Sequence, residues 1–409
     1  MMLPLQFNNR VALRSCNQQG LLNFFLGVLN SVYSTQILKM MSPTLNFETS
    51  HISKVPIFIG DRGFVEKVAA NASELISIAS RDWDSFETSW DFAGLDLISH
   101  KKSEISLSKS WLELEKEMLA NFARARELEE ANNRLVIDMY ELQDELCDAV
   151  TESQVTLYRP NLEIDMRRLI SYAVGCMMGR YSLDEPGLIC AHGGSFESSR
   201  YHKFPADVDG IIPITDEPWF EDDAAERMRE FVKVVWGGDT LVENMEWLAD
   251  SLSRKSGESA EEVIRSYLTT SFYKDHLQTY KRRPIYWLFS SGKQKAFECL
   301  VYLHRYNEGT LSRMRMEYVV PLQSRMQARI DKLTDDIDSA TSSAQQKAVQ
   351  KRKDKLTKQL EELRRFDETL RPYADQRITL DLDDGVKVNY GKFGNLLADV
   401  KVITGGKEE

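Results

Sequence analysis

Two long runs of helical periodicity constrain the fold of this chain more than any other feature. In the first run, apolar residues recur at steps of three and four residues, which is the spacing of one helix face: Leu114, Met118, Phe122, Ala125, Leu128, Leu135, Met139, Leu142 and Leu146. A helix over Trp111–Val150 would extend roughly 60 Å, and such a rod is more often a spacer than a site. The second run, Leu311–Leu370, is interrupted by Ser339–Ser343 and predicts a helical hairpin.

The segment between the two runs, residues 156–320, has a mixed pattern. Gly210–Ile214 and Pro284–Phe289 are short apolar runs beside turn residues, and they predict strands. A Ser290-Ser291-Gly292 turn is expected to cap a helix over Lys293–Tyr302. Further helices are predicted over Met166–Tyr181, Glu221–Trp236 and Leu241–Leu252.

The two ends of the chain differ. A helix is predicted over Leu21–Met41, followed by an extended Lys54–Ile59. Near the other end, apolar residues alternate on both sides of Asp384-Gly385, which predicts a β-hairpin over Ile378–Tyr390. The expected fold class is therefore helix-rich α+β. Its expected parts are a connector at 1–60, a helical spacer at 61–155, a mixed domain at 156–320, a helical hairpin or coiled coil at 321–371, and a C-terminal β-hairpin and tail at 372–409.

Composition points to a cytoplasmic protein. The 409 residues are enough for two or three domains. The five cysteines form no Cys-x-x-Cys pair, which favours a reducing compartment over a disulfide framework. No apolar run is long enough to span a membrane, and Met1–Gln6 lacks the charged start of a secretory signal.

Charge is distributed unevenly along the chain. The net charge of −11 taken alone argues against nucleic-acid binding. From Gly210 to Glu262, however, fourteen Asp and Glu face five Lys and Arg, a local net charge of −9. From Ser271 to Arg329, eleven Lys and Arg face four Asp and Glu, a local net charge of +7. A basic segment in an acidic protein indicates a DNA-facing surface better than the overall charge does.

The motifs of an autonomous enzyme are absent from the sequence. All eleven prolines are isolated, so the (Asp/Asn)-Pro-Pro-aromatic turn of an adenine methyltransferase does not occur. None of the twenty-one glycines forms the Gly-x-Gly that lets backbone N–H groups approach a nucleotide-like cofactor. The six histidines are far apart in sequence, which leaves no His-x₃-His zinc helix. No catalytic, cofactor-binding or metal-binding residue is therefore expected in this chain.

The basic segment supplies the candidate site. Lysines and arginines here are interleaved with aromatic residues, and they could neutralise phosphates or read guanine. The candidate DNA-binding residues are Lys274, Lys281, Arg282, Arg283, Tyr286, Lys293, Lys295 and Arg305. The alternative is that the acidic 210–262 segment neutralises this cluster within the same domain.

Two other polar segments carry open alternatives. Arg167 and Arg168 could touch phosphate, or they could pair with neighbouring acids such as Asp165. The Gly- and Ser-rich segment His192–His202 is expected to be a loop, and it could set sequence preference or be passive.

Several separated blocks resemble one family in the same order. They are most specific at Leu169–Ile189, at Lys281–Gly292 and at Asp375–Ile378 with Asp381–Phe393. The blocks resemble the C-terminal, target-recognition part of BREX-type adenine-specific DNA methyltransferases, the PglX family. These enzymes are related to single-chain type II restriction–modification methyltransferases. The resemblance covers Leu21 to about Val402.

The resemblance implies the DNA-recognition portion of a site-specific adenine-N6 DNA methyltransferase of a phage-defence or restriction–modification system. The implied partners are double-stranded DNA, a methyltransferase domain or subunit, and other BREX components. S-adenosylmethionine is implied for the complete family enzyme, and this chain is expected to be inactive alone. Residues 1–60 would be the end of the methyltransferase domain. A truncated product and a separately encoded specificity subunit both fit this length. The alternative function is a protein-interaction scaffold whose coiled helices dock defence-system partners.

Overall fold

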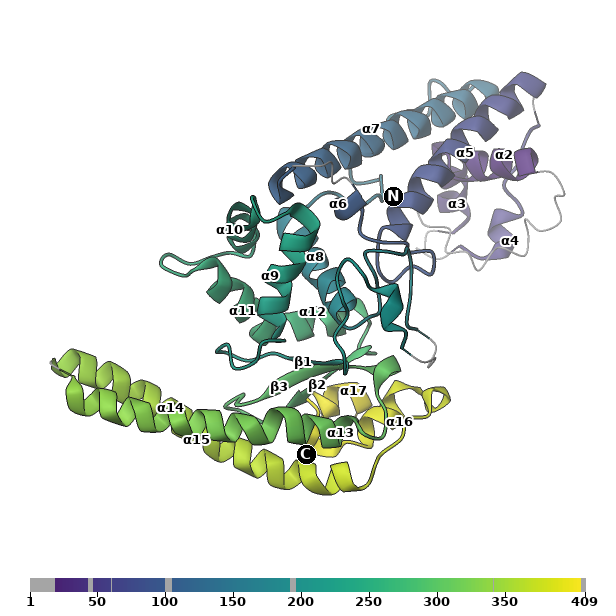
Figure 1. Cartoon of the computed structure of the whole chain (residues 1–409). Coiled ribbons are helices and arrows are strands. Elements are labelled where there is room, and N and C mark those ends of the chain that lie inside the picture. The colour runs from purple at the N-terminus through teal and green to yellow at the C-terminus, as the bar shows by residue number, and fades with distance from the viewer. Residues whose placement is uncertain are drawn as a thin grey trace. The chain divides into compact units, whose positions relative to one another are not determined.

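The computed structural model describes residues 19–42, 47–59, 61–99, 105–191, 196–340 and 342–405. The chain divides into two compact units, which are described separately here (Figure 1). Unit 1 comprises Met1–Ser89 and Leu112–Asn161, and unit 2 comprises Trp90–Trp111 and Leu162–Glu409. The structure is rich in helices and contains one small antiparallel sheet, so the expected helix-rich α+β class is confirmed.

Unit 1 is helical. The single helix predicted over Leu21–Met41 is two helices, because Ser31 interrupts it as the N-cap of the second helix. Its hydroxyl also donates to Val28 O at 2.6 Å. The helices of this unit are α2 (Gln19–Leu29), α3 (Val32–Met41), α4 (Thr49–Ile52), α5 (Arg62–Asp84) and the part of α7 (Leu107–Met139) from Leu112 onward.

The core of unit 1 forms where α2 packs on α5 and α7. Phe24 and Val28 of α2, Val68 of α5 and Val136 of α7 are buried together. Gly27 permits this approach, since a Cβ there would lie 2.7 Å from Val68 Cγ1. The rod predicted over residues 111–150 ends instead at Met139, and residues 140–150 continue without regular helix.

Among the described residues, no single helix is long and apolar enough to span a membrane. Only α2 and α3 taken together, with a 62° bend between them, satisfy the length and composition of a span. Several residues of both helices are buried in the unit 1 core.

Unit 2 is built around a three-stranded antiparallel sheet in the order β1-β3-β2. The strands are β1 (Ile211–Pro213), β2 (Tyr286–Ser290) and β3 (Glu298–Tyr302). The strands predicted at 210–214 and 284–289 are confirmed, with small shifts. The helix predicted over Lys293–Tyr302 is wrong. Its second half is β3, which is buried along its whole length between the other two strands.

Helices cover both faces of this sheet, α8 to α12 on one side and the C-terminal helices on the other (Figure 1). The three helices predicted between residues 166 and 252 are confirmed as α8, α9 and α10. The helical elements of unit 2 that precede β2 are α6 (Asp96–Ser99), α8 (Leu162–Met177), η2 (Ser198–Arg200), α9 (Ala224–Trp236), α10 (Leu241–Ser251), α11 (Ala260–Thr270) and α12 (Phe272–Thr279).

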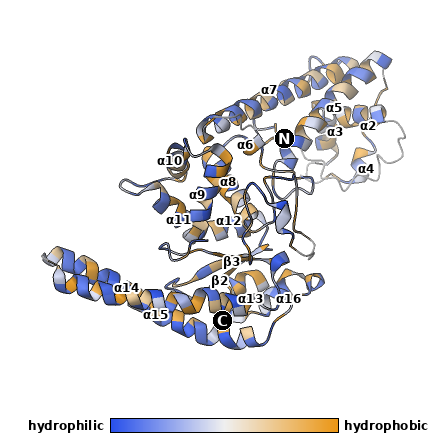
Figure 2. Ribbon diagram, viewed as in Figure 1, coloured by the Kyte–Doolittle hydropathy of each residue, from blue (hydrophilic) through white to orange (hydrophobic). Residues whose placement is uncertain are grey.

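The predicted helical hairpin is confirmed as α14 (Val320–Ser339) and α15 (Ser343–Asp375). Hydrophilic and hydrophobic residues alternate along both helices (Figure 2), and the buried residues include Leu322, Met326, Leu356 and Leu360. Three short elements precede α14: η3 (Leu303–Arg305), α13 (Thr310–Arg313) and η4 (Met314–Val319).

The element η4 is a π-helix, a rare geometry that is often found at functional sites. It carries Tyr318, whose hydroxyl lies 2.8 Å from Asp222 Oδ2 and 3.1 Å from Asp209 Oδ2. Burial, followed by the neighbouring Asp207, raises the pKa of the Asp209 carboxyl to about 7.

The C-terminal β-hairpin predicted over Ile378–Tyr390 is wrong. The segment forms η5 (Leu382–Asp384) and α16 (Gly385–Gly391), followed by η6 (Gly394–Leu396) and α17 (Val400–Thr404). Among the alternating residues, Leu382 and Val388 are exposed and only Tyr390 of these three is buried, next to the buried Asn389. The segment nevertheless covers the outer edge of β2, through a bridge between Phe289 and Leu397.

Candidate nucleic-acid interface

The candidate DNA-binding residues lie near two opposite ends of the β2–β3 pair. Tyr286 pairs with Tyr302 at one end, and Ser290 pairs with Glu298 at the other. The first end carries Lys281, Arg282, Arg283 and Arg305, and the second carries Lys293 and Lys295. Lys274 is exposed on α12. The structure therefore does not gather all eight residues into one patch.

The loop of Lys281, Arg282 and Arg283, which connects α12 to β2, is called here the cation loop. All three side chains are exposed, and none forms an ion pair within the part of the chain that the structure describes. The acidic 210–262 segment finds other partners, so it leaves these charges unneutralised. Its ion pairs are Arg265–Asp223, Arg227–Glu230, Arg229–Glu226, Arg229–Glu261, Arg254–Glu246, Arg254–Asp250, Arg352–Glu217 and Lys355–Asp216.

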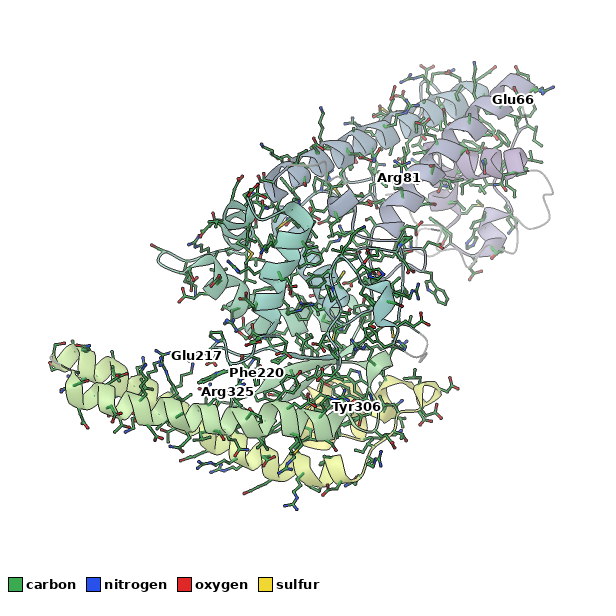
Figure 3. All side chains as sticks on the ribbon, viewed as in Figure 1. Glu66, Arg81, Glu217, Phe220, Tyr306 and Arg325 are labelled. Carbon is green, nitrogen blue, oxygen red and sulfur yellow. The ribbon has the colours of Figure 1, made fainter. Side chains whose placement is uncertain are left out.

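The acidic segment is held instead against the helical hairpin. Arg325 of α14 donates to Trp219 O, and its guanidinium lies over the Phe220 ring at 5.5 Å from the centroid (Figure 3). Arg352 of α15 pairs with Glu217 at 3.0 Å.

The backbone of the cation loop is strained. Lys281 and Arg282 both have left-handed φ values, 51° and 60°. Residues other than Gly rarely adopt this region, because Cβ approaches the carbonyl oxygen. Hydrogen bonds at the end of α12 hold the loop, from Arg282 N to Leu277 O at 2.7 Å and from Arg283 N to Tyr280 O at 2.9 Å.

A buried histidine anchors the far side of the cation loop. His276 Nε2 accepts hydrogen bonds from the backbone N–H groups of Ile285 at 3.1 Å and Tyr286 at 3.2 Å. Burial, followed by the positive charge of Arg180, lowers the pKa of His276 to about 3. The ring is therefore neutral at physiological pH and keeps its proton on Nδ1. Sequence reasoning gave His276 no role, since nothing local indicates which backbone it meets.

Tyr286 is wholly buried in β2 and contributes to the core. Its ring stacks on His276, with centroids 4.8 Å apart, and meets Tyr302 edge to face. A side chain without exposed surface does not reach a ligand on the folded protein, so Tyr286 supports the cation loop from beneath.

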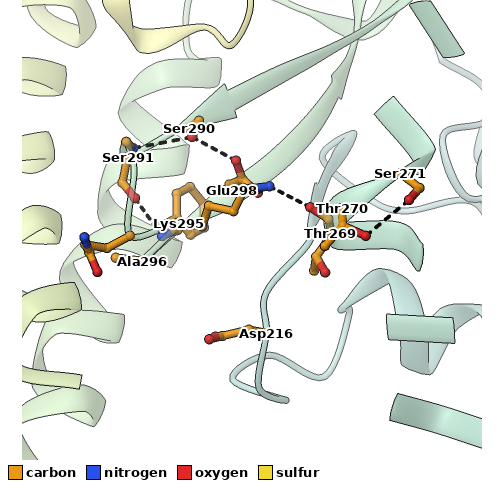
Figure 4. A network of polar contacts seen from close by, with 12 residues as sticks. Asp216, Thr269, Thr270, Ser271, Ser290, Ser291, Lys295, Ala296 and Glu298 are labelled. Atoms are coloured by element: carbon orange, nitrogen blue, oxygen red, sulfur yellow. Dashed lines mark hydrogen bonds and ion pairs between the residues drawn. The ribbon is translucent and has the colours of Figure 1, made fainter. Parts of the chain in front are cut away.

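Lys295 has structural partners (Figure 4). Its Nζ donates to Thr269 O at 2.7 Å and lies 3.1 Å from Glu298 Oε2. The Glu298 side chain is almost wholly buried, and burial raises its pKa. Lys295 therefore compensates a buried carboxylate, whereas Lys293 is exposed in the same turn.

Arg305 also contacts other residues of unit 2. Its guanidinium donates to Val208 O at 2.8 Å and Met178 O at 3.3 Å, and it lies over the Phe196 ring at 3.7 Å from the centroid. Burial lowers its pKa.

The Arg167-Arg168 pair and the 192–202 segment both form side-chain contacts in the part of the chain that the structure describes. Arg167 pairs with Glu163 and Asp275, and Arg168 pairs with Asp165. Of the two interpretations of these arginines, the structure therefore shows pairing with acidic residues. Residues 192–195 of the predicted 192–202 loop lie outside the described residues. In the remainder, Arg200 pairs with Glu185, and Tyr201 donates to Gly179 O at 2.6 Å.

Among the described residues, no three His, Cys, Asp or Glu side chains are grouped as metal ligands. The turn after β2 contains Gly292, but the carboxylate of Glu362 accepts from Gln294 N, Ala296 N and Ser291 Oγ there. These donors of the turn are therefore already used within the chain.

Comparison with known proteins identifies two relatives of this chain. No protein-family model matches it. It is 45% identical over 410 residues to the adenine-specific methyltransferase BrxX of Escherichia coli O9:H4 (strain HS), across 94% of this chain. It is 37% identical over 404 residues to the adenine-specific methyltransferase PglX of Lacticaseibacillus casei (strain Zhang), across 97% of this chain. The chain spans 33% of the length of each relative. The chain is therefore homologous to about one third of proteins named BrxX and PglX adenine-specific methyltransferases.

Proposed function

We propose that this chain is the DNA-recognition portion of an adenine-specific methyltransferase of a BREX-type phage-defence system. In this proposal it binds double-stranded DNA in the cytoplasm, and a methyltransferase region elsewhere binds S-adenosylmethionine and transfers the methyl group to adenine N6. The relatives are named adenine-specific methyltransferases, which supports this proposal. No step of methyl transfer is assigned to this chain.

The observation that carries the proposal is the unpaired charge of the cation loop. Three adjacent cations, Lys281, Arg282 and Arg283, are exposed without an acidic partner in the described chain, although the protein is acidic overall. Such charges release counterions from DNA when they meet phosphates. Lys274 and Lys293 are also exposed, but Lys293 lies at the other end of the sheet. The proposed contact is therefore limited to the cation loop, while Tyr286, Lys295 and Arg305 contribute to the fold.

The test is DNA affinity as a function of salt. Replacing Lys281, Arg282 and Arg283 with Ala should weaken binding of a short labelled duplex and flatten the salt slope by about 0.9 per lost phosphate contact. The matched control replaces three exposed lysines of α15, Lys347, Lys351 and Lys358, with Ala. It removes the same charge elsewhere in unit 2.

Equal losses in both triple variants would show that only net charge matters. Unchanged affinity in the cation-loop variant would refute the DNA-contact assignment. DNA binding that is absent from the unaltered chain would favour the scaffold function.

A further inference from the structure

A fourth cation lies beneath the cation loop. Arg180 follows α8 and is only 8% exposed. Its Nε donates to Tyr181 OH at 3.0 Å, and its guanidinium lies over the rings of Tyr181 and Tyr280 at 5.3 and 5.9 Å from their centroids. Within the described chain no Asp or Glu forms an ion pair with it, and its surroundings are tyrosines. Buried arginines are ordinarily paired, because an isolated buried charge is costly.

Chain connectivity places Arg180 at the cation loop. Tyr280, over which the guanidinium lies, is the residue immediately before Lys281. His276, which holds the other end of the loop, is close enough for the charge of Arg180 to lower its pKa. Arg180 is thus packed against the base of the loop that carries the three exposed cations.

At three positions in and below the cation loop, a positively charged residue is present although it lowers the stability of the folded chain. Arg180 is a buried charge without a counter-charge, and Lys281 and Arg282 occupy backbone conformations that favour glycine. A sequence selected only for folding would be better served by a neutral residue at position 180 and by glycine at 281 or 282. A stronger positive electrostatic potential at the loop surface explains all three residues. A buried charge in a low dielectric is weakly screened, so Arg180 adds to the potential at the surface above it.

We propose that Arg180, Lys281 and Arg282 form one preorganised site for a phosphodiester group of a nucleic-acid backbone. Lys281 and Arg282 contact the phosphate, and Arg180 is a positioning residue that strengthens the site from below. This inference rests on the proposed function and adds the ligand group and the source of the affinity.

The first test compares Arg180→Met with Arg180→Lys. Removing an unpaired buried charge should leave the melting temperature of Arg180→Met unchanged or higher, while its affinity for duplex DNA falls about tenfold, the size expected of one nearby charge. Arg180→Lys keeps the charge and should retain most of the affinity. A large loss of stability in Arg180→Met, or equal DNA affinity in both variants, would overturn the role assigned to Arg180.

The second test uses glycine. The Lys281→Gly, Arg282→Gly variant should melt at a higher temperature than the unaltered chain and bind DNA more weakly, because it relieves strain and removes contacts. The control is Arg377→Gly, at another arginine with left-handed φ, 49°, whose DNA affinity should not change. A lower melting temperature of the double variant would show that the loop is not strained.

The outcomes separate this inference from the proposed function. If the cation-loop alanine variant binds DNA normally, the proposed function fails. If that variant loses affinity while Arg180→Met keeps it, only the inference about Arg180 fails.

Discussion

Glu362 of α15 occupies the space that a side chain at Gly292 would need. A Cβ built on Gly292 would lie 2.9 Å from Glu362 Oε2, and the glycine itself has φ of 133°. The same carboxylate accepts from Ser291 Oγ at 2.8 Å and Gln294 N at 2.7 Å. One acidic side chain therefore fixes the turn between β2 and β3 to the helical hairpin.

Gly292→Ala should lower the free energy of unfolding by about 1–3 kcal/mol, because alanine is strained at this φ and displaces Glu362. Thermal or denaturant unfolding measures the effect. Gly391→Ala is the matched control, since it has no atom within 4 Å of an added Cβ and no left-handed φ. It should be neutral or slightly stabilising. Equal behaviour of the two variants would mean that Glu362 moves aside freely.

Lys295→Ala should destabilise the fold and leave DNA affinity unchanged. The substitution strands the buried Glu298 carboxylate, but Lys295 itself is 48% exposed, so we expect a loss of about 1–2 kcal/mol rather than the full cost of breaking a buried pair. Adding Glu298→Gln should recover part of this stability, because it removes the stranded charge. A Lys295→Ala variant that folds normally and loses DNA affinity would make Lys295 a contact residue after all.

Asp209 should make unit 2 less stable as pH rises toward neutrality. Its pKa is about 7 in the folded protein because of burial and the neighbouring Asp207, whereas an unfolded Asp titrates near 3.9. The folded state therefore holds an extra proton between about pH 4 and 7, and the stabilisation this provides is lost as pH rises through 7. Melting temperatures of the unaltered protein and Asp209→Asn across this range give the comparison. The variant should show a flatter profile, and the exposed Asp239→Asn should not.

The sequence predicted local features of the fold well and long-range pairings poorly. Strand β2 and the helical hairpin follow from short-range patterns. The Ser290-Ser291-Gly292 turn predicts a helix over Lys293–Tyr302, but pairing with β1 and β2 decides the state of residues 298–302. The Cys299-Leu300-Val301-Tyr302 run, rich in residues that favour strands, was the signal available.

At the candidate site, too, local features could be predicted from the sequence and long-range contacts could not. Exposure of Lys281, Arg282 and Arg283 was predictable from local charge. The roles of Lys295 and Arg305 were not, because their partners Glu298 and Val208 O are brought to them by the fold. Arg180 and His276 are distant from each other in sequence, and only packing brings them beneath one loop.

The last prediction concerns the apolar stripe that first suggested a long helix. Leu135, and Leu142 just beyond the end of α7, are partly buried against the core of unit 1. Leu135→Asp or Leu142→Asp should destabilise unit 1 by about 1–3 kcal/mol, since each places a charge against Val136 and its neighbours. Leu112→Asp is the control. Leu112 lies on the outer side of α7 with 54% of its surface exposed, so the same charge there should change stability little. Equal melting temperatures for all three variants would show that the stripe near 135–142 contributes no packing energy.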